Sequence, residues 1–156
     1  MTHEDYMRKA IEIAKETEAQ GGVAIGAILV KDGEIIAVGH SLPGTTLDAT
    51  AHGEIAAIRA TCQKLKTINL DGCVLYSTLE SCGMCLSAAV WANISAYYFG
   101  AYATDVPDNH YELKNYNSEE RAKQTQRWDG TQIQAIGGIL REECKALLDE
   151  YKDWVK

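Results

Sequence analysis

The sequence predicts a three-layer α/β domain, with helices packed over a five-stranded sheet. Segments with helical apolar spacing alternate with short β-branched apolar segments, in the order α-β-β-α-β-α-β-β-α. Internal repeats and low-complexity segments are absent, and the length of 156 residues is typical of one domain spanning residues 1–156. The pattern leaves the strand order open.

The first half of the chain predicts a helix, a hairpin and a second helix. Thr2 and Asp5 are typical of a helix N-cap with an acidic first turn. Apolar residues then recur at helical spacing until Gly21 and Gly22. The turn signal Lys31-Asp32-Gly33 separates two apolar segments, as in a β-hairpin. We therefore expect a helix over residues 3–20, strands over 23–30 and 34–39, a loop over 40–49 and a helix over 52–66.

The second half predicts the remaining strands and helices. Asp71-Gly72 is a turn signal before a short apolar strand, and Ser81-Cys82 opens a third run of helical spacing. Residues 101–130 lose all periodicity, and such a long irregular stretch is often functional; a short helix capped by Ser118 is expected within it. Gly137-Gly138 precedes the last helix. We expect strands over 73–78, 94–100 and 132–136, and helices over 81–91, 118–126 and 139–154.

Charge and composition exclude several classes of function. The 15 Lys and Arg against 22 Asp and Glu leave a net charge of -7, so we expect no nucleic-acid partner. The longest apolar run, residues 23–30, is too short to span a bilayer, and no signal peptide is visible, so we expect no membrane partner and a cytoplasmic location. Five cysteines in a reducing compartment favour metal binding or catalysis over a disulfide framework.

Two short motifs carry the chemistry. His52-x-Glu54 and Cys82-x-x-Cys85 are separated by 27 residues, and H-x-E followed by P-C-x-x-C is typical of zinc nucleobase deaminases. Thiolates at a helix N-terminus and one neutral imidazole would hold a single Zn²⁺ per chain. Three protein ligands leave the fourth position to a water, as in catalytic zinc sites. Glu54 lies beside the ligands and is placed to carry the proton of that water.

Less specific alternatives remain. A lone C-x-x-C is also typical of a redox pair or of half a structural zinc site, and a non-catalytic zinc module would need a fourth protein ligand. The remaining cysteines lie inside apolar helix or strand segments, where we expect buried hydrophobic side chains. His110 lies in the irregular stretch, where we expect a solvated loop residue and keep a substrate contact as the alternative. We expect the aromatic cluster of Trp91 and residues 97–99 to be core or subunit interface. These side chains are Cys62, Cys73, Cys144, His110, Trp91, Tyr97, Tyr98 and Phe99.

With these motifs the chain resembles the cytidine-deaminase superfamily, in the branch of cytosine, guanine and tRNA adenosine deaminases. Residues 21–27 resemble G-G-x-P-x-G-A, residues 52–54 match H-G-E, and residues 75–82 resemble L-Y-x-T-x-E-P-C. Ser81 stands in place of the proline, which loses a rigid turn but should leave the ligand Cys82 intact. The resemblance implies an α-β-α fold with a mixed five-stranded sheet. It also implies a homodimer or higher homo-oligomer.

The resemblance also implies residue roles. His52, Cys82 and Cys85 would hold the zinc, and Glu54 would shuttle the proton. Expected substrate contacts are Ser41, where many relatives have asparagine, the backbone near Gly53, and the side chains of Ile25, Glu80 and Trp154; the last resembles an aromatic tail that caps the pocket in cytosine deaminases.

The reaction implied is hydrolytic deamination of a free small-molecule base with release of ammonia. A ring with a 2-amino-4-oxo edge, as in isocytosine or guanine, is the first expectation, and cytosine is the alternative. A tRNA adenosine deaminase or a non-catalytic zinc module is less favoured, the former because of the net charge of -7.

Overall fold

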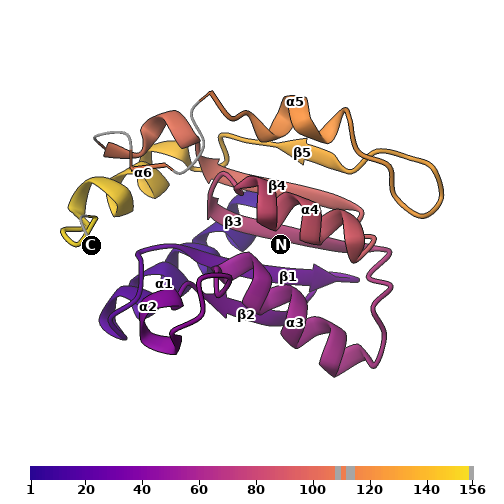
Figure 1. The fold of residues 1–156 in the computed structure, drawn as a ribbon, viewed down its shortest axis with the longest axis horizontal. Coiled ribbons are helices and arrows are strands. Elements are labelled where there is room, and N and C mark those ends of the chain that lie inside the picture. The colour runs from indigo at the N-terminus through magenta and orange to yellow at the C-terminus, as the bar shows by residue number, and fades with distance from the viewer. Residues whose placement is uncertain (108–109, 112–114, 155–156) are drawn as a thin grey trace.

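A mixed five-stranded sheet forms the centre of the molecule in the computed structural model, which describes residues 1–107, 110–111 and 115–154 (Figure 1). The strand order is β2-β1-β3-β4-β5. β1 runs antiparallel to both of its neighbours, while β3, β4 and β5 are parallel. The strands are β1 (Gly26–Lys31), β2 (Glu34–His40), β3 (Cys73–Leu79), β4 (Ala96–Ala101) and β5 (Gln134–Ile136).

Helices cover both faces of this sheet, so the predicted three-layer α/β architecture is confirmed. One face packs against α1 and α6, and the other packs against α3, α4 and α5; Figure 1 shows α3 and α4 in front of the strands. The helices are α1 (His3–Ala19), α2 (Pro43–Thr46), α3 (Gly53–Leu65), α4 (Gly83–Trp91), α5 (Ser118–Ala122) and α6 (Arg141–Glu150), with a 3₁₀ turn η1 (Ala103–Asp105).

Alternation along β1 explains why both faces are apolar. Ala27 and Leu29 belong to the buried cluster under α3 and α4, whereas Ile28 and Val30 belong to the cluster under α1 and α6. Successive side chains of a strand point to opposite faces, so a strand covered on both sides is apolar at every position. The central strands therefore fix the layers that carry the site.

Several element ends differ from the sequence expectation for local reasons. α4 starts one residue after Cys82, whose extended backbone makes it the N-cap. The short helix α5 is capped by Asn117, whose side chain accepts the Glu120 N–H, so the expected cap Ser118 is wrong: it is the buried first helical residue. α2 was not expected at all. The remaining differences are short: β1 begins at 26, β4 at 96 and β5 at 134, and α6 covers 141–150.

The expected buried residues divide into core and surface. Cys73, Cys144, Tyr97 and Phe99 are buried, and Cys62 is half-buried. Trp91 is 80% exposed, so it is a surface residue and not part of the core. Residues 108–109 and 112–114 of the irregular stretch lie outside the described residues.

A close backbone contact places the start of α3 against β2. A Cβ atom on Gly39 would lie 1.8 Å from the carbonyl oxygen of Gly53 and 2.8 Å from the nitrogen of Ala57. Only a residue without a side chain allows this approach. The contact holds the start of α3, and with it the preceding residue His52, against β2.

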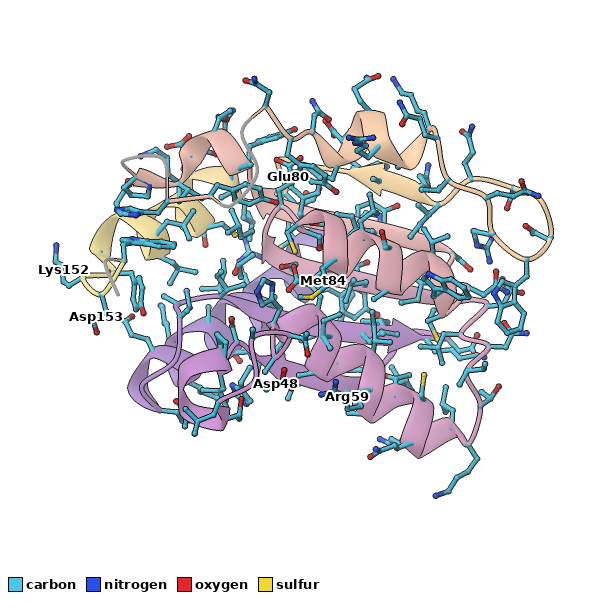
Figure 2. The ribbon with its side chains drawn as sticks, viewed as in Figure 1. Asp48, Arg59, Glu80, Met84, Lys152 and Asp153 are labelled. Carbon is cyan, nitrogen blue, oxygen red and sulfur yellow. The ribbon has the colours of Figure 1, made fainter. Side chains whose placement is uncertain are left out.

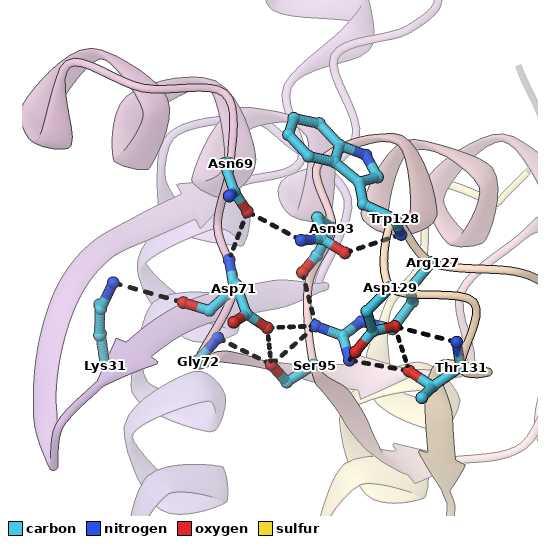
Figure 3. Close-up of polar contacts among 10 residues, drawn as sticks. All are labelled: Lys31, Asn69, Asp71, Gly72, Asn93, Ser95, Arg127, Trp128, Asp129 and Thr131. Atoms are coloured by element: carbon cyan, nitrogen blue, oxygen red, sulfur yellow. Dashed lines mark hydrogen bonds and ion pairs between the residues drawn. The ribbon is translucent and has the colours of Figure 1, made fainter.

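Arg127 joins the loop before β5 to the start of β3 at the other end of the sheet (Figure 3). Its guanidinium pairs with Asp71 and donates to the Asn93 carbonyl and the Ser95 hydroxyl, both at 3.2 Å. Its side chain is only 8% exposed. This buried cation therefore fastens a segment that has little regular structure. Across the described residues, helices long and apolar enough to cross a membrane are absent.

Candidate active site

Three expected ligands converge where the starts of two helices meet. His52 is the N-cap of α3 and Cys82 is the N-cap of α4, with Cys85 in the first turn of α4. The Nδ1 atom of His52 lies 3.7 Å from the Sγ of Cys82 and 3.5 Å from the Sγ of Cys85. All three ligand atoms lie within 4.8 Å of one another. Both cysteines follow the carboxyl end of β3, and the close contact between Gly39 and Gly53 positions the histidine.

The surroundings favour a thiolate in this cluster. Hydrogen bonding from Cys85, followed by that from His52, lowers the pKa of the Cys82 thiol to about 4, against the opposing effect of burial. The free N–H groups and the dipole of a helix start act in the same direction. Thiolate is the form of cysteine that binds metals.

The spacing of the donors fits Zn²⁺. Zinc–sulfur and zinc–nitrogen bonds of about 2.3 and 2.0 Å place neighbouring tetrahedral ligands about 3.5 Å apart, which agrees with the two nitrogen–sulfur distances above. A sulfur, sulfur and imidazole nitrogen set is one that zinc prefers. Among the described residues these three make the one such cluster, so a ligand position remains for solvent or substrate.

Glu54 lies beside the three ligands on the first turn of α3. It is 4% exposed, and burial raises the pKa of its carboxyl. Its Oε1 atom accepts the Ser81 hydroxyl at 2.9 Å and the Ser77 hydroxyl at 3.3 Å. A buried carboxyl next to a metal site, with one oxygen hydrogen-bonded, is suited to carrying protons.

A cavity of about 210 Å³ opens onto this cluster. Its lining includes the expected residues His52, Glu54 and Cys82 together with Ile25, Ser41, Glu80 and Trp154. Cys85 is fully buried behind Cys82, and Gly53 packs against β2. The structure thus places most of the expected site residues around one enclosed space.

The carboxylate of Glu80 is already engaged by the backbone. Its Oε2 accepts the Ala103 N–H at 2.7 Å, and its Oε1 accepts the Ser118 N–H at 2.6 Å. Glu80 follows β3, and Asp153, which also lines the cavity, lies on the C-terminal segment (Figure 2). Glu80 therefore holds two distant segments against the cavity, and this leaves it less free to bind a ligand.

The sequence analysis missed several cavity residues. The structure places His110 at the cavity, with its ring stacked on Trp154 at a centroid distance of 5.9 Å and an interplanar angle of 6°. This position favours the alternative, a residue at the site, over the solvated loop residue that was expected first. Trp154 itself is held by its Nε1 atom, which donates to the Leu148 carbonyl at 3.0 Å. Further missed lining residues are Val23, Pro43, Leu79, Val106, Tyr111, Tyr151 and Asp153.

The one sequence signal that could have indicated these lining residues is the occurrence of large ring side chains in two segments late in the chain. His110 and Tyr111 are ring side chains in the segment without periodicity, and Tyr151 and Trp154 lie at the end of the helix expected over residues 139–154. Burial of a large ring usually needs a partner. The sequence alone does not indicate that these two segments are in contact.

Comparisons with known proteins agree with this geometry. Residues 1–101 match the family model described as the cytidine and deoxycytidylate deaminase zinc-binding region. A tRNA-specific adenosine deaminase of Bacillus subtilis is 38% identical over 152 residues, covering 97% of this chain and 89% of that protein. A guanine deaminase of Bacillus subtilis is 42% identical over 109 residues, covering 69% of this chain and 70% of that protein. The structure of a guanine deaminase from Nitrosomonas europaea superposes with a TM-score of 0.83 at 26% identity, over 96% of this chain and 84% of that chain.

Proposed function

Because the chain belongs to the cytidine and deoxycytidylate deaminase zinc-binding family, and is a zinc-dependent deaminase, we propose that its substrate is a free heterocyclic base with a 2-amino-4-oxo edge, such as guanine or isocytosine. The single observation that carries this choice of substrate is the small cavity, about 210 Å³, that is lined by the ligands His52 and Cys82 and by Glu54. Ligand cavities for drug-sized molecules are roughly 300–1,000 Å³, so this one suits a single small ring.

The residues have separate roles in the reaction. His52, Cys82 and Cys85 would hold Zn²⁺, which supplies a Lewis acid that activates water near neutral pH. Glu54 takes a proton from the attacking water and delivers it to a ring nitrogen. It then moves the second proton of that water, from the new hydroxyl on the ring carbon, to the leaving amine. The water oxygen forms a bond to the ring carbon, the carbon–nitrogen bond breaks, and ammonia and the oxo ring leave. Proton transfer of this kind contributes about 10²–10⁴-fold.

The cavity walls suit a flat ring with a polar edge. Ser41 lines the cavity and is 3% exposed, and its backbone carbonyl accepts the Val23 N–H at 3.1 Å. The stacked rings of His110 and Trp154 are part of the cavity lining. A buried polar edge that is left unpaired costs enough to reject near analogues. Cytosine is the alternative substrate, since it carries an isomeric edge.

A tRNA adenosine deaminase is the second candidate, because the relative matched over 97% of the chain has that activity. Such an enzyme must accept a base attached to a polynucleotide, whose phosphates are bound by basic side chains. The net charge of -7 and the rings over the cavity argue against this substrate. The homodimer or higher assembly and the cytoplasmic location remain predictions from the sequence.

Ammonia release from a panel of substrates tests the proposal. The purified, zinc-loaded protein is assayed with guanine, isocytosine, cytosine and tRNA, with the Glu54→Gln variant as the control for background release. We expect activity on guanine or isocytosine to exceed that on cytosine and tRNA. Higher activity on tRNA, with an affinity that falls as salt rises, would support the second candidate instead.

A further inference from the structure

One carboxylate oxygen of Glu54 is held by two hydroxyls, one from β3 and one from the connection between β3 and α4. Ser81 Oγ donates to Glu54 Oε1 at 2.9 Å, and Ser77 Oγ lies 3.3 Å from the same atom. Ser77 is on β3 and Ser81 follows it, and both are buried. The second oxygen of Glu54 accepts neither hydroxyl, so the two hydroxyls distinguish one oxygen from the other.

The backbone of Ser81 is held from the opposite side. Its N–H donates to the hydroxyl of Tyr97, a fully buried residue of β4. The Tyr97 hydroxyl in turn donates to the Leu79 carbonyl at 3.3 Å. A buried N–H and a buried hydroxyl each need such a partner, so these contacts restrict the position of Ser81.

A proline at this position would supply neither interaction. The typical family motif has proline before the first cysteine of C-x-x-C, and proline has no backbone N–H and no hydroxyl. In this chain, Ser81 replaces a rigid ring with two hydrogen bonds that connect Tyr97 to Glu54. Ser81 therefore links the turn that carries the ligand Cys82 to the orientation of Glu54, the proton carrier.

We propose that Ser81 is a positioning residue, whose hydroxyl, fixed through Tyr97, holds one oxygen of Glu54 so that the other oxygen faces the reacting water. This rests on the proposed function, since it assigns Glu54 the role of proton carrier. Hydrogen bonds to a charged acceptor are stronger than neutral ones and preorganise the acceptor for catalysis. The chemistry stays with Glu54, and Ser81 acts through it.

Removal of the hydroxyl tests the proposal. Ser81→Ala keeps the backbone N–H bonded to Tyr97 but removes the donor to Glu54. We expect kcat to fall about tenfold, which corresponds to about 1.4 kcal/mol, with KM changed less than about twofold. Ser77→Ala removes the longer contact, and its loss should be smaller. Ser87→Ala, the same substitution at an exposed position of α4, is the matched control and should match the wild type.

The proposal also predicts non-additivity and a structural change. In a Glu54→Gln background Ser81→Ala should cause no further loss, because residues that act as a unit are not additive. In crystal structures of the zinc-loaded proteins, Glu54 should occupy one conformation in the wild type and turn or split in Ser81→Ala. Zinc content and melting temperature of the folded variant should stay close to those of the control.

Two results would overturn it. If kcat of Ser81→Ala equals that of Ser87→Ala while Glu54 keeps its position, the hydroxyl does not position the carboxylate. If kcat falls and the Glu54 conformer is unchanged, the effect runs through another group. Should the wild type deaminate none of the tested bases or tRNA, the proposed function fails separately, and the Glu54 conformer in the crystals still decides the role of Ser81.

Discussion

Replacing Glu54 by glutamine tests the proton carrier with little change of shape. Glutamine is nearly isosteric, and its carbonyl oxygen can accept the same hydroxyls of Ser81 and Ser77, at 2.9 and 3.3 Å in the wild type. An amide does not take up the proton of water. The loss is therefore chemical: about 10²–10⁴-fold in kcat, or about 3–5 kcal/mol in the barrier.

The assay is ammonia release by the zinc-loaded protein on the best base of the panel, with zinc content measured on the same samples. Glu54→Gln should keep its zinc, because the three ligands are untouched. Glu12→Gln, at an exposed position of α1, makes the same chemical change away from the cavity and should leave kcat unchanged. A Glu54→Gln protein with more than about a tenth of the wild-type rate and full zinc would show that another group carries the proton.

Three further changes have expected outcomes. Cys85→Ala should lose most of its zinc and some thermal stability, measured by atomic absorption and melting; full zinc retention would contradict the ligand assignment. Arg127→Ala should lower the free energy of unfolding by about 2 kcal/mol in urea titrations while kcat is unchanged, because buried hydrogen bonds are lost far from the cavity. Asp105 accepts two N–H bonds from Arg141, which lower the pKa of its carboxyl; this pair therefore stabilises the fold above about pH 4 and the contribution is lost as pH falls below it. Asp105→Asn should remove this acid-dependent part of the unfolding free energy, and an unchanged pH profile would refute it.

The parts of the molecule that were predictable have a local cause. The longer helices and the central strands followed from apolar spacing, because β1, β3 and β4 are covered on both sides and each of these helices has a buried face. His52, Glu54, Cys82 and Cys85 followed from motif spacing, since ligands close in sequence share one turn. These signals need no knowledge of how distant segments meet.

The remaining features depend on contacts between distant segments. His110 lies in an irregular loop, and Trp154 lies beyond α6 in a segment that was expected to be helical, so the local pattern did not indicate that the two rings pair. The Ser81–Glu54 contact joins residues 27 apart in the sequence. Because Ser81 differs from the family motif, comparison with the motif indicated only the loss of a rigid turn and not the new hydrogen bond. The role of Asn117 as helix cap was hidden by the equally good cap residue Ser118 beside it.

His52 and Cys82 occupy positions where helices usually place Ser, Thr, Asp or Asn, and neither makes a capping hydrogen bond. The residues that follow them, Gly53 and Gly83, are the least resistant to fraying. A Zn²⁺ held by these residues would therefore stabilise both first turns, as two caps of about 1 kcal/mol each would otherwise do. Removal of the metal by a chelator should therefore fray the first turns of α3 and α4 together. The cavity lining at His52 and Cys82 and the metal site would then lose their structure in the same step.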